Sequence, residues 1–137
     1  MCVYRASGRP APQDPKGPEI WSGAVDELGQ DRLRLSRLCD RLRSMSEAAL
    51  SRSRDELGGE SVAVSVHRVC VWAVTQQGIA APVPVLHPLA SADQLTVIGR
   101  EFLEWVASNA AESDAGASHA GALNTWRTEV DRIRRSV

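Results

Sequence analysis

A run of apolar residues spaced three, four and seven positions apart constrains this chain more than any other feature. Such spacing puts apolar side chains on one face of a helix and polar side chains on the other. Gly58 and Gly59 follow the run, and glycine commonly stands just after a helix. We therefore predict one long helix over residues 18–57, weakened and bent near Gly29. The apolar stripe comprises Trp21, Val25, Leu28, Leu35, Leu38, Leu42, Met45 and Ala49.

The stretch SVAVSVHRVCVWAVTQQGI, residues 61–79, is rich in valine, which favours strands. As a strand it would have no purely apolar face, whereas a helix collects most of its apolar residues in one arc. The ending TQQGI suits a helix stop in which Gly78 is left-handed and Ile79 folds back. We predict a helix here. The alternative is an α+β fold with a β-hairpin around residues 61–86.

The second half of the chain contains two more amphipathic patterns. Prolines make residues 79–90 an extended connector. Ser91 and Gln94 have the spacing of a capping box, which predicts a helix that starts there. A loop over about 109–119 and a last helix complete the chain. The predicted fold is an all-α, bundle-like domain of about four amphipathic helices over residues 18–137, after a disordered tail over residues 1–17.

Length and charge limit the classes of function. A chain of 137 residues and 14.8 kDa is of one-domain size. Its formal net charge of −1 argues against a protein that coats nucleic acid or lipid by bulk charge. Three cysteines without a CxxC motif, no signal peptide and no long apolar run predict a cytoplasmic protein without a membrane partner.

The apolar stripe of the first predicted helix is longer than the three shorter helices can cover. A second copy of the chain would cover the remaining part of the stripe. We therefore predict a small protein–protein interaction or adaptor domain that forms a homodimer. Trp72 projects from the polar arc of its predicted helix, which suggests a second contact surface or cover by the connector. The predicted seam residues on the first helix are Leu28, Leu35, Leu38, Leu42 and Met45.

Arginines on the opposite side of the first helix support another interpretation. Arg34, Arg37 and Arg41 project away from the leucines, and such a face can contact phosphates. The chain has no recognisable helix-turn-helix and no aromatic residue among these arginines. A regulator that binds nucleic acid is therefore an alternative that we do not favour, and an acidic protein partner explains the arginines equally well.

No motif in the sequence predicts a catalytic residue, a cofactor or a metal. His67 and Cys70 have helical spacing, but zinc needs three or four ligands, so we interpret them as a core pair. Glu101 and Glu104 fit a solvated helix face. His87 lies between prolines in the connector. A small-molecule-binding protein or enzyme with a pocket near this connector is the second alternative.

Overall fold

The computed structural model describes the backbone of residues 16–109 and 113–137, and the side chains of residues 27–108 and 119–137. The chain divides into two compact units, residues 1–30 and residues 31–137. In the first unit, the described backbone is helical from Lys16. Most of the predicted tail over residues 1–17 therefore lies outside the described residues. The second unit contains the remaining helices and is the subject of the sections below.

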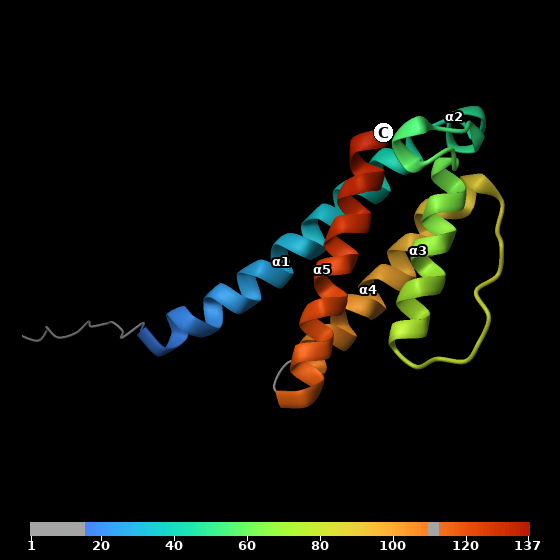
Figure 1. Ribbon diagram of the computed structural model, residues 1–137. Helices are drawn as coiled ribbons and strands as arrows, with labels where there is room; N and C mark the ends of the chain where they lie inside the picture. The colour runs from blue at the N-terminus through green and yellow to red at the C-terminus, as the bar shows by residue number, and fades with distance from the viewer. Residues whose placement is uncertain (1–15, 110–112) are drawn as a thin grey trace, which may run out of the picture. The chain divides into compact units, whose positions relative to one another are not determined.

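Helices make up most of the described parts of the chain (Figure 1). One isolated β-bridge joins Ser53 and Ser61, and no strand is present in these parts. The all-α prediction is therefore confirmed, and the α+β alternative is wrong. The elements are α1 (Lys16–Arg43), α2 (Glu47–Ser51), the 3₁₀ helix η1 (Asp55–Leu57), α3 (Val62–Gln76), the 3₁₀ helix η2 (Pro88–Ala90), α4 (Ser91–Asn109) and α5 (Ser113–Ser136).

The long first helix ends earlier than predicted. It runs unbroken through Gly29 but stops at Arg43, and residues 47–57 form α2 and η1 instead of its continuation. Serine hydroxyls compete for the backbone here. The Oγ of Ser44 donates to the carbonyl of Arg41, and the Oγ of Ser46 accepts the N–H of Ala49 at the start of α2. Gly58 therefore does not end the long helix as predicted; with a φ of +67° it ends η1 instead.

The valine-rich stretch is α3, as its spacing predicts. The Oγ of Ser61 caps its first turn by accepting the N–H of Val64. At the other end Gly78 has a φ of +73°, and the N–H of Ile79 donates to the carbonyl of Val74. This is the predicted glycine stop. Burial of the apolar arc and two good caps outweigh the small β preference of valine.

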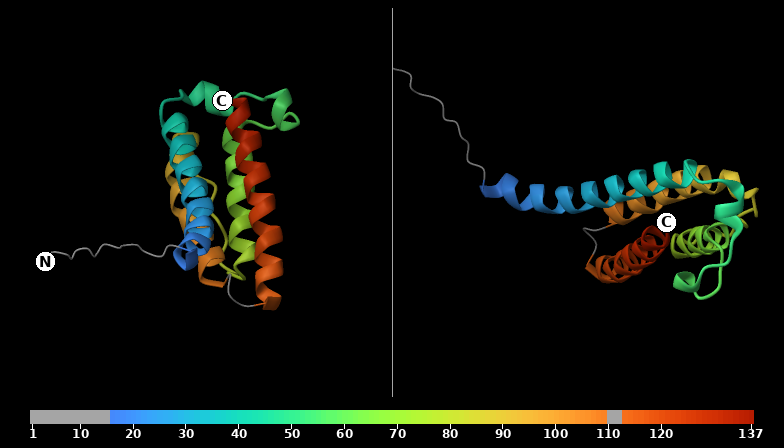
Figure 2. Two further views of the ribbon diagram at one scale, coloured as in Figure 1. Left: turned by 90° about the vertical axis from the view of Figure 1, so that its left-hand side faces the viewer. Right: turned by 90° about the horizontal axis from the view of Figure 1, so that it is seen from above.

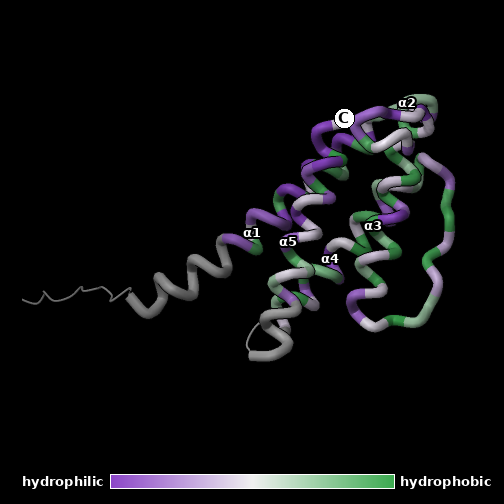
Figure 3. The backbone as a smooth tube through the Cα atoms, in the orientation of Figure 1, coloured by the Kyte–Doolittle hydropathy of each residue, from purple (hydrophilic) through white to green (hydrophobic). Residues whose placement is uncertain are grey.

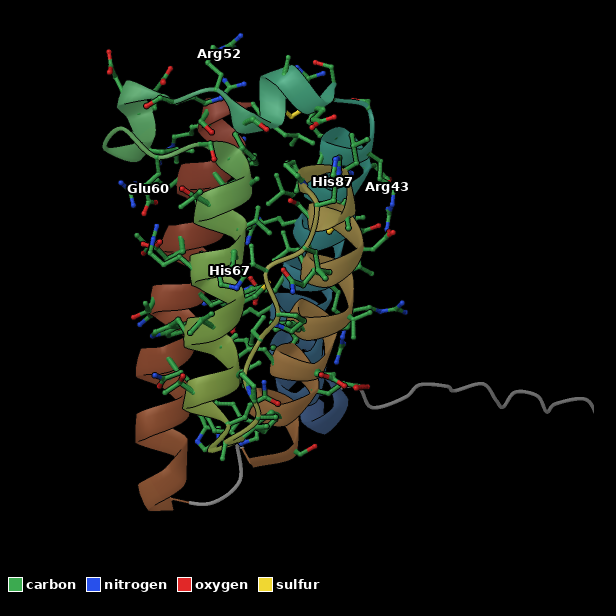
Figure 4. The ribbon with its side chains drawn as sticks, turned by 90° about the vertical axis from the view of Figure 1, so that its right-hand side faces the viewer. Arg43, Arg52, Glu60, His67 and His87 are labelled. Atoms are coloured by element: carbon green, nitrogen blue, oxygen red, sulfur yellow. The ribbon has the colours of Figure 1, made fainter. Side chains whose placement is uncertain are left out.

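The connector between α3 and α4 lies against both helices. The Nε2 of His67 on α3 is 3.2 Å from the carbonyl oxygen of Val83, and the Nε2 of Gln94 on α4 donates to the carbonyl of Pro84. Figure 4 shows His67 beside this segment. The predicted capping box is not formed, because the N–H of Ser91 donates to the carbonyl of Pro88, and the Gln94 side chain instead holds the connector. Helix α4 does begin at Ser91 as predicted.

The last helix is longer than predicted. Helix α5 begins at Ser113, so the expected loop over 109–119 is wrong for residues 113–119, and residues 110–112 lie outside the described parts. Three alanines between Ser113 and Gly121 favour a helix strongly enough to offset two glycines.

In the second unit, four helices pack in two pairs, as Figure 2 shows. The part of α1 from residue 31 lies beside α4, and α3 lies beside α5. Phe102 on α4 is fully buried at the centre. Its ring centroid is 5.0 Å from that of Trp126 on α5, 5.4 Å from that of Trp72 on α3 and 5.8 Å from that of Trp105. One aromatic cluster thus joins three helices.

The absence of a side chain at Gly99 allows α1 and α5 to approach α4. A Cβ atom at this position would lie 2.8 Å from Cδ2 of Leu35 and 2.9 Å from Cη2 of Trp126. Both of these side chains are almost fully buried, so neither can move into solvent. Leu35 and Trp126 therefore both pack against Gly99, and this packing limits how close α1 and α5 lie to α4.

We expect Gly99→Ala to destabilise the protein. Overpacking costs about 1–3 kcal/mol, while alanine in a helix returns about 1 kcal/mol, so the free energy of unfolding should fall by about 1 kcal/mol. Gly121→Ala in α5 is the matched control, because a Cβ there meets nothing within 4 Å. The control should be neutral or stabilising in urea unfolding. Equal effects of the two substitutions would contradict the tight contact at Gly99.

Candidate anion-binding groove between α1 and α5

Helices α1 and α5 run in the same direction, and arginine bonds join them at two points. Arg127 on α5 bonds to Asp31 on α1, and Arg41 on α1 bonds to the carbonyl of Val137. Each pair is separated by 96 residues, so the two helices stay in one register between the bonds. At about 1.5 Å per residue, ten residues of helix place the two bonds about 15 Å apart.

The first bond is a buried ion pair. The Nε of Arg127 lies 3.0 Å from Oδ1 of Asp31, and its Nη2 lies 2.7 Å from Oδ2. The Asp31 side chain is only 2% exposed. Arg34 adds a second positive charge 3.6 Å away. A buried carboxylate needs such partners, so Asp31 holds Arg127 and Arg34 at one end of the two helices.

The second bond caps the end of α5. Arg41 donates from Nε at 3.1 Å and from Nη2 at 2.9 Å to the carbonyl oxygen of Val137. Arg54, from the segment before η1, donates to the neighbouring carbonyl of Ser136. The last carbonyls of a helix lack partners within the helix and carry partial negative charge, so two guanidinium groups suit this end.

Between the two bonds the helices leave an open groove of about 790 Å³. We call it the arginine groove. Figure 3 shows that this part of α1 and the upper part of α5 are largely hydrophilic. Among the described residues, its lining includes six arginines and two aspartates, a net charge of +4. The lining residues are Asp31, Arg34, Arg37, Trp126, Arg127, Thr128, Val130, Asp131, Arg132, Arg134 and Arg135.

The arginines of the groove differ in how they are held. Arg37 is exposed and has no hydrogen bond or ion pair with any residue that the structure describes. Arg134 and Arg135 both bond to Asp131 in the same helix. The hydrogen bond from Arg134, together with the charges of both arginines, keeps the pKa of Asp131 below its ordinary value. Arg37 is thus the arginine that can bind an added anion without losing another contact.

Two of the three arginines predicted to contact phosphate line this groove. Arg34 and Arg37 face it from α1, while Arg41 is occupied at the end of α5. The sequence prediction missed Arg127, Arg134 and Arg135 on α5. Arg127 and Arg134 are seven residues apart, which places them on one helix face and was the available signal. Their position opposite α1 depends on contacts across 96 residues.

Most of the residues that were predicted to form a dimer interface are buried in the core of the second unit. Leu35, Leu38 and Leu42 are each 2% exposed and belong to its core. Leu28, in the first unit, and Met45 are half-buried. A homodimer through this seam would have to open the core, so the dimer stays a prediction that this arrangement does not favour.

Trp72 is also half-buried, with its ring against Phe102. Much of its surface is therefore already used for packing within the chain.

The remaining candidates have structural partners. Burial raises the pKa of the Cys70 thiol to about 12, which keeps it protonated and unreactive. The Nδ1 of His87 accepts the N–H of Leu89 and caps η2, and its Nε2 lies 3.3 Å from Glu47. No group of three or more possible metal ligands occurs among the described residues.

Comparisons with known proteins add no information on function. The chain matches no protein-family model, no curated protein and no solved structure. Within the described residues, no helix has the length and apolar character that crossing a bilayer requires. The arginine groove is therefore interpreted from its own geometry.

We expect Arg127→Met to destabilise the protein by about 2–3 kcal/mol, because it leaves the carboxylate of Asp31 buried with only the more distant Arg34. Arg43→Met is the matched control. Arg43 pairs with exposed Asp40 and Asp93, so its loss should cost less than about 1 kcal/mol. Urea unfolding of both variants measures the difference. Similar losses would show that the pair with Asp31 has no special structural role.

Proposed function

We propose that this chain is a protein-interaction domain that binds an acidic segment of a partner protein in the arginine groove. The observation that supports the proposal is the placement of arginines on both sides of one groove, with Arg34 and Arg37 on α1 and Arg134 and Arg135 on α5. Guanidinium groups bind carboxylates through two parallel hydrogen bonds, and arginine is enriched at protein interfaces. The groove fits a segment about 15 Å long, which is about ten residues of helix.

The distribution of charge favours an acidic protein segment over nucleic acid. The groove residues carry +4 and the whole chain carries −1, so the remaining residues carry −5. A long polyanion would meet repulsion outside the groove, whereas a short acidic segment would not. Trp126 and Val130 form the floor of the groove but are almost fully buried, so a bound segment would contact mainly the arginine side chains.

A cytoplasmic location remains part of the proposal. Cys39 and Cys70 are buried and form no disulfide, and free thiols suit a reducing compartment. The homodimer remains an alternative, in which the acidic segment belongs to a second copy. The small-molecule alternative loses its main support, because His87 caps η2 and pairs with Glu47.

The proposal predicts that Arg37→Glu abolishes binding of an acidic peptide. The probe is a fluorescent amphipathic peptide of about ten residues, with leucines on one face and glutamates on the other. We expect the affinity to fall about tenfold or more, as for an arginine at the centre of an interface. Fluorescence anisotropy at low and at about 150 mM ionic strength measures it, and the higher salt should weaken binding to the unsubstituted protein.

Arg52→Glu is the matched control for this experiment. Arg52 is exposed at the end of α2, does not line the groove, and its substitution changes the net charge by the same amount (Figure 4). It should change the affinity by less than about twofold. A peptide with glutamines in place of the glutamates should not bind. Equal binding of both peptides would refute the proposal, and tighter binding of a generic DNA duplex would favour the nucleic-acid alternative.

A further inference from the structure

Asp131 occupies two arginines of the groove in the free protein. Its Oδ1 accepts hydrogen bonds from Nη2 and from Nε of Arg134, the latter at 3.2 Å, and its Oδ2 pairs with Nη2 of Arg135. The two arginines follow it by three and four residues, which places all three side chains on the same face of α5. Both carboxylate oxygens are therefore bound by groups that could bind the carboxylate of a partner.

The two aspartates of the groove differ in exposure. The Asp31 side chain is 2% exposed and joins two helices, so it belongs to the frame of the groove. The Asp131 side chain is 33% exposed, and its partners Arg134 and Arg135 are 56% and 74% exposed. Ion pairs between exposed side chains of one helix are weak and exchange readily with water. Asp131 can therefore be displaced, whereas Asp31 cannot without loss of the frame.

We infer that Asp131 is an internal competitor, whose carboxylate occupies Arg134 and Arg135 until a partner's carboxylate replaces it. The inference rests on the proposed function, because it concerns the same groove. It identifies Asp131 as a residue that lowers the affinity of the groove for acidic segments and makes the groove more selective among them. A single weak anion does not displace it, whereas a segment that also binds Arg34 and Arg37 across the groove gains enough contacts to do so.

The test compares three variants with the acidic peptide described above. Asp131→Asn removes the competing charge but keeps the shape of the side chain, so the peptide should bind about three to ten times more tightly. Asp131→Glu keeps a carboxylate in reach of the same helix face and should bind like the unsubstituted protein. Asp40→Asn is the matched control. It removes one negative charge from an exposed pair with Arg43, outside the groove, and should change affinity by less than about twofold.

Carboxyl ¹³C NMR gives a second readout that a purely structural role would not change. In the free protein the pKa of Asp131 lies below its ordinary value because Arg134 and Arg135 bind it. When the peptide takes these arginines, the carboxylate loses its partners and gains negative neighbours. Its pKa should therefore rise on peptide binding.

Each outcome supports or overturns the inference. Tighter binding by Asp131→Asn alone, with a rise in the pKa of Asp131 in the unsubstituted complex, supports it. Unchanged or weaker binding by Asp131→Asn would overturn it, since Asp131 would then position the arginines or be irrelevant. If Asp40→Asn tightened peptide binding as much as Asp131→Asn does, the effect would come from the net charge of the protein and not from the groove. If the unsubstituted protein binds no acidic peptide, the proposed function fails as well, whereas binding that depends on Arg37 but not on Asp131 overturns only this inference.

Discussion

The close packing of Leu35 and Trp126 against Gly99 is the constraint on which the groove depends. It joins α1 and α5 through α4 at one point, where no larger residue than glycine fits without displacement. Trp126 also stacks on Phe102 in the core and contributes to the lining of the arginine groove. The same indole thus belongs to the core and lies directly beneath the groove. A change in core packing at this point would alter the separation of the two rows of arginines.

Charged side chains also hold α1 and α5 in place. Two parallel helices place their dipoles side by side in the same sense, which is unfavourable, and their carboxyl ends lie at the same end of the groove. Arg41 and Arg54 bond to the last carbonyls of α5 and offset this cost. At the other end, Arg127 bonds to the buried carboxylate of Asp31. The arginines at both ends therefore hold the helices, and of those between them Arg134 and Arg135 bind Asp131.

Local sequence patterns predicted most of the helices, but they could not predict contacts between residues far apart in the chain. The capped, valine-rich α3 and its stop at Gly78 follow from spacing and turn chemistry within a few residues. The end of α1 at Arg43 was missed, because the apolar stripe continues past the serine at position 46 that starts a new helix. The arginines of α1 were identified, but their counterparts on α5 were not. Nothing local shows that Asp31 lies against Arg127.

The number of arginines in the sequence overstates the positive charge that a partner would meet. Arg41 and Arg54 face helix carbonyls, Arg127 shares a carboxylate with Arg34, and Asp131 occupies two more. Arg132 has only a distant ion pair with Glu129, and Arg37, two turns before the end of α1, has no partner among the described residues. A partner's first carboxylate can bind there at no cost to the fold, and each further contact must replace an internal one. Such an order of contacts makes the groove selective for several carboxylates held at a helical spacing rather than for any single anion.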